Sequence, residues 1–174
     1  MDIKSLHHVA YRCKDAKQTA DFYTRILGLE YAMAVSEDRV PSTGEQHPYM
    51  HIFFRMDDGS YVAFFELPES PAMGRDGNTP LWVQHLALRV PDEATLMKNK
   101  TRLESHDVEV LGPVDHTICK SIYFFDPNGH RLELAVDTMD ERMKRDLSSV
   151  SEAMLDEWSK TKKAPHHADW VHKK

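Results

Sequence analysis

One stretch of this sequence occurs twice, and that repeat limits the fold more than any other feature. HVAYRCKD begins at His8 and HLALRVPD begins at His85, an offset of 85 − 8 = 77 positions. In both copies apolar residues alternate along a short segment that ends at an Asp, the pattern of a strand followed by a helix N-cap. Each copy alone leaves an apolar face exposed, so the two are expected to pack against each other. The other aligned pairs are Ala10 with Ala87, Arg12 with Arg89, Asp15 with Asp92 and Ile26 with Leu103.

Each copy continues into three further predicted strands, which makes a βαβββ unit. Gly28 is the expected C-cap of the first helix, Asp57-Asp58-Gly59-Ser60 is a hairpin turn, and residues 68–80 form a linker rich in Pro and Gly. We therefore predict an α+β fold, in which modules at residues 1–67 and 81–137 form curved mixed sheets around a central cleft. The first module is predicted to hold strands at 6–12, 29–35, 49–56 and 61–67, a helix at 16–27 and a loop at 36–48. The second is predicted to hold strands at 82–90, 108–111, 121–125 and 131–136 and a helix at 92–104.

A further helix and a tail are expected after the second module. Thr138-Met139-Asp140-Glu141 has the pattern of a capping box, and an apolar stripe at helical spacing follows it. We assign residues 138–163 to this helix and expect its stripe to pack on the body or on a second subunit. Residues 164–174, which include His166, His167 and His172, are expected to form a mobile tail. The stripe consists of Met143, Leu147, Val150, Met154 and Trp158.

Composition excludes several classes of function. The chain has 174 residues, a net charge of -6 and no basic stripe interleaved with aromatic residues, so nucleic acid is not an expected partner. No apolar run approaches the roughly 18 residues that a membrane span requires. The first ten residues, MDIKSLHHVA, contain no apolar signal region, so we expect a cytoplasmic protein. Two cysteines are too few for a disulfide framework.

A carboxylate in an apolar strand gives the first indication of a metal site. Glu133 lies within the predicted strand 131–136, where burial of a carboxylate is costly unless it is paired or bound to metal. Glu66 lies on the last predicted strand of the first module, and His8 and His85 open the two copies. If the two sheets curve toward one another these four residues can converge. Two imidazoles with one or two carboxylates suit Fe(II), Mn, Co, Ni or Zn.

The same residues carry a family likeness. The segments LHHVAYRCKD, QHLALRVPD and FFDPNGHRLEL, within residues 3–137, resemble the vicinal oxygen chelate superfamily. That superfamily includes glyoxalase I, bleomycin and fosfomycin resistance proteins and extradiol ring-cleaving dioxygenases. The resemblance implies a divalent metal held by His8, His85 and Glu133, with positions left open for two vicinal oxygens of a small-molecule substrate. It also implies a homodimer.

Residues 114–133 look most like the extradiol dioxygenase signature. In that signature a His is followed by an apolar residue and Tyr, then by Asp-Pro-x-Gly, then by the ligand Glu. Here these positions are His116, Ile122-Tyr123, 126–129 and Glu133. The resemblance implies that His116 and Tyr123 are catalytic groups that hydrogen-bond the oxygens of a catechol chelated to Fe(II). An extradiol-type dioxygenase is therefore our leading prediction.

Two other functions stay open. If Glu66 is a fourth ligand, the set matches glyoxalase I, a lyase in which Glu66 or Glu133 shuttles a proton at a metal with two open positions. In that case the metal has no position for oxygen beside a bidentate catechol. The third hypothesis is a non-catalytic resistance-type protein that sequesters a ligand in the cleft between the modules.

Overall fold

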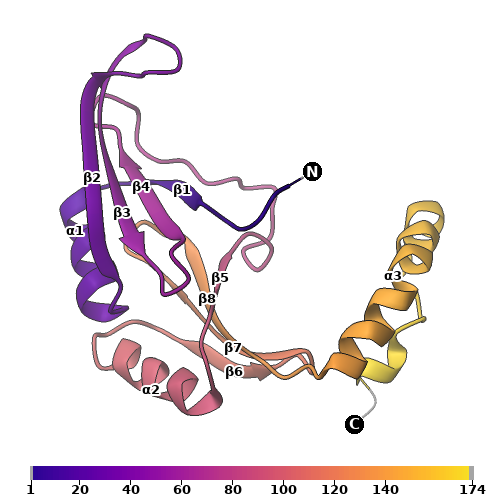
Figure 1. Ribbon diagram of the computed structural model, residues 1–174. Helices are drawn as coiled ribbons and strands as arrows, with labels where there is room; N and C mark the ends of the chain where they lie inside the picture. The colour runs from indigo at the N-terminus through magenta and orange to yellow at the C-terminus, as the bar shows by residue number, and fades with distance from the viewer. Residues whose placement is uncertain (1, 173–174) are drawn as a thin grey trace.

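The computed structural model describes residues 2–172 and contains two four-stranded mixed sheets with helices on their outer sides (Figure 1). The strand orders are β1-β4-β3-β2 and β5-β8-β7-β6. This arrangement confirms the predicted α+β fold with two βαβββ units. The first unit comprises β1 (His8–Cys13), α1 (Ala16–Asp21), η1 (Phe22–Ile26), β2 (Glu30–Arg39), β3 (Gln46–Arg55) and β4 (Tyr61–Glu66). The second comprises β5 (Leu86–Arg89), α2 (Glu93–Glu104), β6 (Leu111–Asp115), β7 (Cys119–Phe125) and β8 (Arg131–Asp137).

The two units repeat the same strand pairing. The first strand of each runs parallel to the last, β1 beside β4 and β5 beside β8, and the remaining pairs are antiparallel. Ala10 lies opposite Ala63 in the first unit, and its repeat partner Ala87 lies opposite Glu133 in the second. The position equivalent to Glu133 is therefore Ala63.

The repeated Asp residues cap the repeated helices. The Asp15 side chain accepts a hydrogen bond from the Gln18 backbone N–H, and Asp92 does the same for Thr95. Both acceptors satisfy backbone donors that the helix leaves unpaired. α1 continues into the single π-helical turn η1, and Gly28, at a φ of 81°, follows the end of that turn as predicted.

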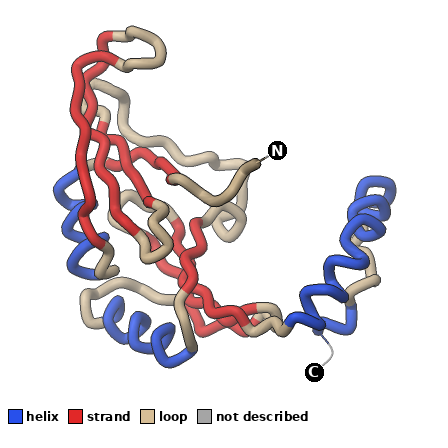
Figure 2. The backbone as a smooth tube through the Cα atoms, in the orientation of Figure 1, coloured by secondary structure: helices blue, strands red, loops and turns tan. Residues whose placement is uncertain are grey.

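One core joins the two modules on the helix side of the sheets. Its largest fully buried side chains are Tyr23, Phe54, Phe64, Phe124, Ile52, Leu96 and Leu103. Tyr23 stacks on Phe54, and its hydroxyl donates a hydrogen bond across the module boundary to the Asp126 carboxylate, with an O···O distance of 3.2 Å. The Arg102 side chain of α2 also donates to the Arg25 carbonyl of η1, so α2 and η1 meet at this point (Figure 2).

The observed strand lengths differ from those predicted. The predicted loop 36–48 is largely strand, because β2 runs to Arg39, β3 begins at Gln46, and a short turn joins them. Polar residues in this hairpin concealed its strand pattern, since most of β2 is exposed. The predicted strand 82–90 is shorter than expected, and His85 precedes β5 directly.

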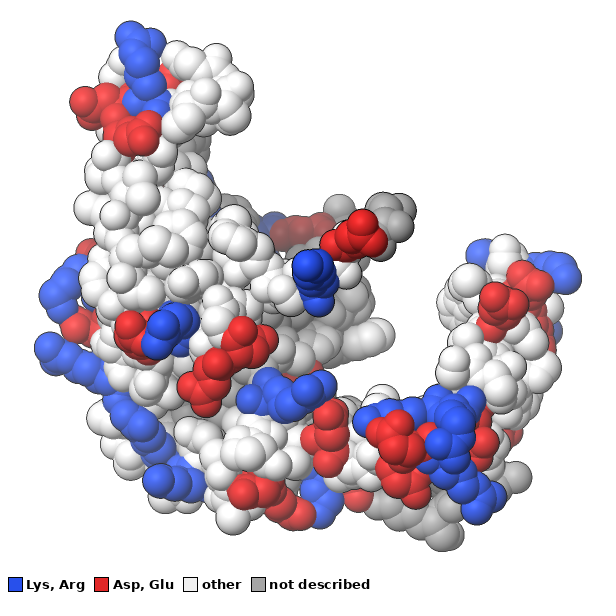
Figure 3. Space-filling model, viewed as in Figure 1, with Lys and Arg blue, Asp and Glu red and all other residues white. Residues whose placement is uncertain are grey.

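The last helix, α3 (Glu141–Thr161), extends away from both sheets (Figures 1 and 3). Its N-cap is Asp140, which accepts from Met143, while the Thr138 hydroxyl donates instead to the Thr117 carbonyl. No residue of α3 is buried, so the expected packing of its stripe on the body is not observed.

The segment after α3 folds back toward that helix. Within the described part, η2 (Asp169–His172) buries Val171, and the His167 ring lies 2.8 Å from the Glu157 carboxylate. The side chain of His172 and residues 173–174 lie outside the described part of the chain. No helix among residues 2–172 is long and apolar enough to cross a membrane.

Candidate metal centre

Glu133 and His85 form the core of the candidate site. Alternation along β8 turns Glu133 away from the helix-side core occupied by Leu132 and Leu134. The Glu133 residue is only 5% exposed, and its Oε2 lies 2.9 Å from His85 Nε2. Two adjacent ligands that each lie roughly 2.1 Å from one metal ion are about 3 Å apart, so this spacing fits a shared cation.

The second ring nitrogen of His85 also has a defined partner. Nδ1 lies 3.1 Å from the Val83 carbonyl oxygen, which can only accept a hydrogen bond, so Nδ1 carries a proton in this pairing. Metal-ligating histidines commonly donate their other N–H to a carbonyl in this way, because the bond fixes the tautomer and the ring orientation. The His85 ring is therefore oriented with Nε2 toward Glu133 as a ligand would be.

Tyr123 and His116 extend this pair into a series of four neighbouring side chains, of which Glu133, Tyr123 and His116 are joined by hydrogen bonds. The Tyr123 hydroxyl donates to Glu133 Oε1 at 3.2 Å, and His116 Nε2 lies 2.8 Å from the same hydroxyl oxygen. Tyr123 faces Glu133 because the two residues are register partners across β7 and β8. Partial burial, followed by the charge of Glu133, raises the pKa of the Tyr123 hydroxyl above its usual value, so it stays protonated at neutral pH.

His8 lies on the other sheet, beside a second histidine. Its ring centroid lies 6.2 Å from that of His51 and 5.8 Å from that of Phe53. His51 stacks on Phe65 at 3.6 Å, and its Nε2 is buried without a hydrogen-bond partner among the described residues. Burial lowers the pKa of His51 to about 4, with a smaller effect from His8. The sequence places His51 on β3 but gives no direction for its side chain.

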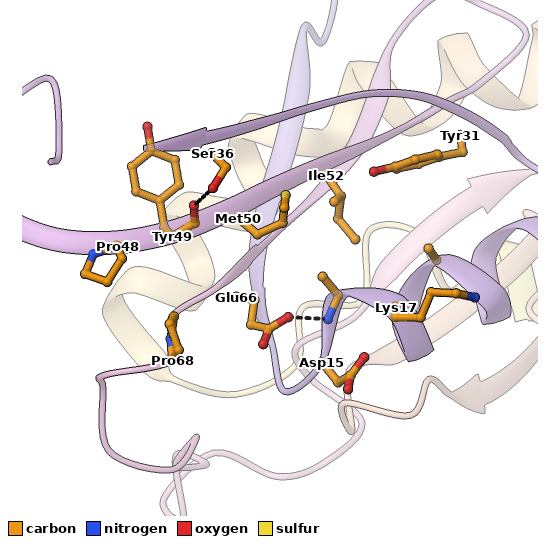
Figure 4. Close-up of a pocket in the computed structure, with 12 residues that line it drawn as sticks. Asp15, Lys17, Tyr31, Ser36, Pro48, Tyr49, Met50, Ile52, Glu66 and Pro68 are labelled. Atoms are coloured by element: carbon orange, nitrogen blue, oxygen red, sulfur yellow. Dashed lines mark hydrogen bonds between the residues drawn. The ribbon is translucent and has the colours of Figure 1, made fainter. Parts of the chain in front are cut away.

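Glu66 does not lie with His8. On β4 it alternates with Phe65 and shares the helix-side face of Phe64. Its Oε2 accepts a hydrogen bond of 2.6 Å from the Ala16 backbone N–H at the start of α1 (Figure 4). The surrounding cavity, of about 540 Å³, is lined by Asp15, Lys17 and apolar residues of β2 and β3. A carboxylate here satisfies a backbone donor of the helix N-terminus.

The structure thus brings four of the six predicted site residues together: His85, His116, Tyr123 and Glu133. His8 and Glu66 lie apart from them and from each other. Within residues 2–172 of one chain, no group of three or more His, Cys, Asp or Glu side chains is arranged to hold a metal ion. Arg89, on the repeated strand β5, forms an ion pair with Asp137.

Paired βαβββ units that carry His and Glu at a sheet face are the hallmark of the vicinal oxygen chelate class. The chain belongs to the Glyoxalase/Bleomycin resistance protein/Dioxygenase superfamily, whose sequence profile matches residues 5–134. The matched range covers both modules and excludes α3.

Individual relatives differ in activity. MhqA of Bacillus subtilis, provisionally named a ring-cleaving dioxygenase, is 28% identical over 141 residues, which are 79% of this chain and 42% of MhqA. This chain therefore spans less than half of that relative. The metallothiol transferase FosB of Staphylococcus epidermidis is 24% identical over 83% of this chain and 89% of FosB. The fold also matches FosX of Listeria monocytogenes, solved with Mn(II) and sulfate, with a TM-score of 0.57 and 21% identity over 81% of this chain and 98% of FosX.

Proposed function

We propose that this chain is an extradiol-type dioxygenase that cleaves a catechol-like substrate, with Fe(II) held by His8, His85 and Glu133. The observation that carries the proposal is the hydrogen-bonded series His116–Tyr123–Glu133. It sets two groups capable of proton transfer directly beside a candidate ligand. The relation to MhqA supports the same reaction class.

A second copy of the chain supplies His8 to this site. His85 and Glu133 belong to the second module, while His8 belongs to the first and forms no metal-holding group with them inside one chain. In a two-fold dimer the first module of one copy can face the second module of the other, which makes two equivalent sites. The stripe on α3, which is only partly buried within one chain, provides additional apolar surface for such a dimer.

Three protein ligands suit this reaction better than four. The Glu66 carboxylate accepts a hydrogen bond from the backbone at the start of α1, and the residue opposite Ala10 is Ala63, which cannot bind a metal. Both observations support a ligand set without a fourth carboxylate. Fe(II) held by His8, His85 and Glu133 alone would keep positions open for both catechol oxygens and for oxygen. The glyoxalase I-like alternative needs Glu66 as a fourth ligand, and the hydrogen bond from the Ala16 backbone to Glu66 argues against that role.

The side chains divide the proton chemistry between them. Fe(II), when bound, would supply Lewis acidity and the redox chemistry of oxygen insertion. The Tyr123 hydroxyl, protonated at neutral pH, can donate a hydrogen bond to a substrate oxygen as charge develops there. His116, at 2.8 Å from that hydroxyl, can pass a proton to or from it. The Val83 carbonyl keeps the His85 ring in its ligating orientation.

Oxygen uptake tests the proposal. Protein loaded with Fe(II) under anaerobic conditions is mixed with a panel of substituted catechols, and uptake is followed together with the yellow ring-opened product. We expect uptake that depends on both Fe(II) and catechol. No oxygen uptake by protein that holds stoichiometric iron would refute the proposed dioxygenase activity. Thiohemiacetal turnover would then indicate lyase chemistry, and catechol binding without turnover a sequestering protein.

A further inference from the structure

A second cavity adjoins the candidate metal centre at His85. It has a volume of about 730 Å³ and lies between residues 73–81, at the end of the linker and the start of the second module, and the turn that joins β7 to β8. His85 forms part of its wall, so a molecule that occupies the cavity can reach the site of Glu133 and Tyr123. The basic and acidic side chains of the lining are Lys14, Arg75, Asp76, His85, His130 and Arg131.

The three cations of this cavity have no carboxylate partner in the described part of the chain. Each is held instead by a backbone carbonyl: Lys14 by Pro127 at 3.2 Å, Arg75 by Gly129 at 3.4 Å, and Arg131 by Leu81 at 3.4 Å. A guanidinium has five N–H donors, so one such bond leaves most of its donors available. In contrast, Arg25, Arg55, Arg89, Arg142, Lys17, Lys100, Lys120 and Lys144 all form ion pairs.

Aromatic rings fix the two guanidinium groups in place. Arg131 lies 4.4 Å above the centre of the Tyr123 ring, and Arg75 lies 5.3 Å from that of Phe125. Stacking of this kind restricts the side chain without consuming its hydrogen-bond donors, so little conformational freedom is lost when an anion binds.

The local charge is opposite in sign to that of the whole protein. Three cations face one carboxylate, Asp76, in a chain with a net charge of -6. Asp76 is itself engaged, because its carboxylate accepts hydrogen bonds from the Thr79 hydroxyl and the Asn78 backbone N–H. The cavity therefore attracts multi-oxygen anions, for which planar guanidinium groups provide paired donors.

We propose that this cavity binds an anionic group, a carboxylate or a phosphonate, on the substrate whose vicinal oxygens lie at the metal centre. The inference rests on the proposed function and names its substrate class. Arg131 and Glu133 are alternate residues on one face of β8, with Cα atoms about 7 Å apart. This separation fits a substrate whose anionic group is a few bonds from its vicinal oxygens.

Binding to metal-free protein tests the anion site separately from catalysis. Isothermal titration would compare three probes without vicinal oxygens: 3-phenylpropionate, 2-phenylethylphosphonate and the neutral 3-phenylpropionamide. We expect at least one acid to bind about tenfold or more tightly than the amide, and the better acid identifies the preferred anion. Arg131→Gln and Arg75→Gln should each weaken that binding about tenfold, whereas Arg131→Lys should retain part of it.

A matched control and the catalytic assay separate the possible outcomes. Arg55→Gln removes a cation that pairs with Glu30 on the β2–β3 hairpin, and it should leave acid binding unchanged. Equal affinity for acids and amide, or acid binding unaltered in a folded Arg131→Gln variant, would overturn the anion site. If the acids bind but no catechol is cleaved, the proposed dioxygenase activity is refuted and the proposed anion site is supported. If neutral and acidic catechols are cleaved equally well, the anion site alone fails.

Discussion

His85 Nε2 and Glu133 Oε2 lie 2.9 Å apart, and each side chain is held by a further hydrogen bond, from His85 to the Val83 carbonyl and from Tyr123 to Glu133. The pair is therefore oriented by groups outside itself. Because all of these atoms belong to the second module, this half of the site is complete within one chain. The remaining ligand that we propose is His8 of the first module.

The role of the Tyr123 hydroxyl can be tested by its removal. Tyr123→Phe keeps the ring beneath Arg131 but deletes the donor to Glu133 and the contact with His116. We expect kcat for ring cleavage to fall by roughly 10²-fold or more while bound iron stays stoichiometric. Tyr31→Phe, which alters an exposed ring on β2, is the matched control. Unchanged turnover in Tyr123→Phe would remove this residue from the mechanism.

Mixed dimers distinguish a site between chains from a site within one chain. His8→Ala and His85→Ala chains each lack one ligand, so neither should bind metal tightly alone. If the site lies between chains, a heterodimer contains one intact site, and random mixing should restore about a quarter of the wild-type metal content. Elemental analysis after co-expression measures this. No recovery in confirmed heterodimers would contradict the shared site.

The buried contact between the modules predicts a stability effect. Tyr23 is fully buried, and Tyr23→Phe removes only its hydrogen bond to Asp126. We expect the free energy of unfolding, measured in urea at fixed protein concentration, to fall by roughly 1.5–3 kcal/mol. Asp126→Ala should cost more, because the Asn128 and His130 backbone donors also lose their acceptor. An unchanged free energy of unfolding in Tyr23→Phe would show that this hydrogen bond does not stabilise the module boundary.

The lowered pKa of His51 predicts that the folded protein loses stability in acid. Its pKa is about 4 in the folded protein, below the roughly 6.5 of an unperturbed histidine. The unfolded chain therefore binds more protons between these values, so stability is full above about pH 6.5 and declines as the pH falls toward 4. His51→Phe, which keeps the stack on Phe65, should reduce the drop in Tm between pH 7 and pH 5. The exposed His106→Gln should not, and equal drops in both variants would exclude His51 as the cause.

The half of the site formed by one hairpin could be predicted from sequence. Tyr123 and Glu133 are neighbours because β7 and β8 pair across a short turn, so alternation alone sets their common face. The repeat likewise gave both helix caps, Asp15 and Asp92, which depend on local hydrogen bonds.

The position of Glu66 depends on pairing between distant strands. Both modules end in a strand that contains Glu, but register with β1 makes Ala63 the equivalent of Glu133, and Glu66 lies three residues further along. An odd displacement on a strand reverses the face. The cavity between Arg75 and Arg131 similarly requires the course of the linker, which has no periodic pattern to predict it.

The metal content of two carboxylate variants tests the ligand assignment most directly. Glu133→Gln and Glu66→Gln make the same chemical change on equivalent-looking final strands, and bound metal can be measured by elemental analysis of folded, dialysed protein. We predict that Glu133→Gln loses tight metal binding, whereas Glu66→Gln retains the wild-type amount with at most a modest loss of stability at the start of α1. Loss of metal from folded Glu66→Gln, or full occupancy in Glu133→Gln, would contradict the site of His8, His85 and Glu133.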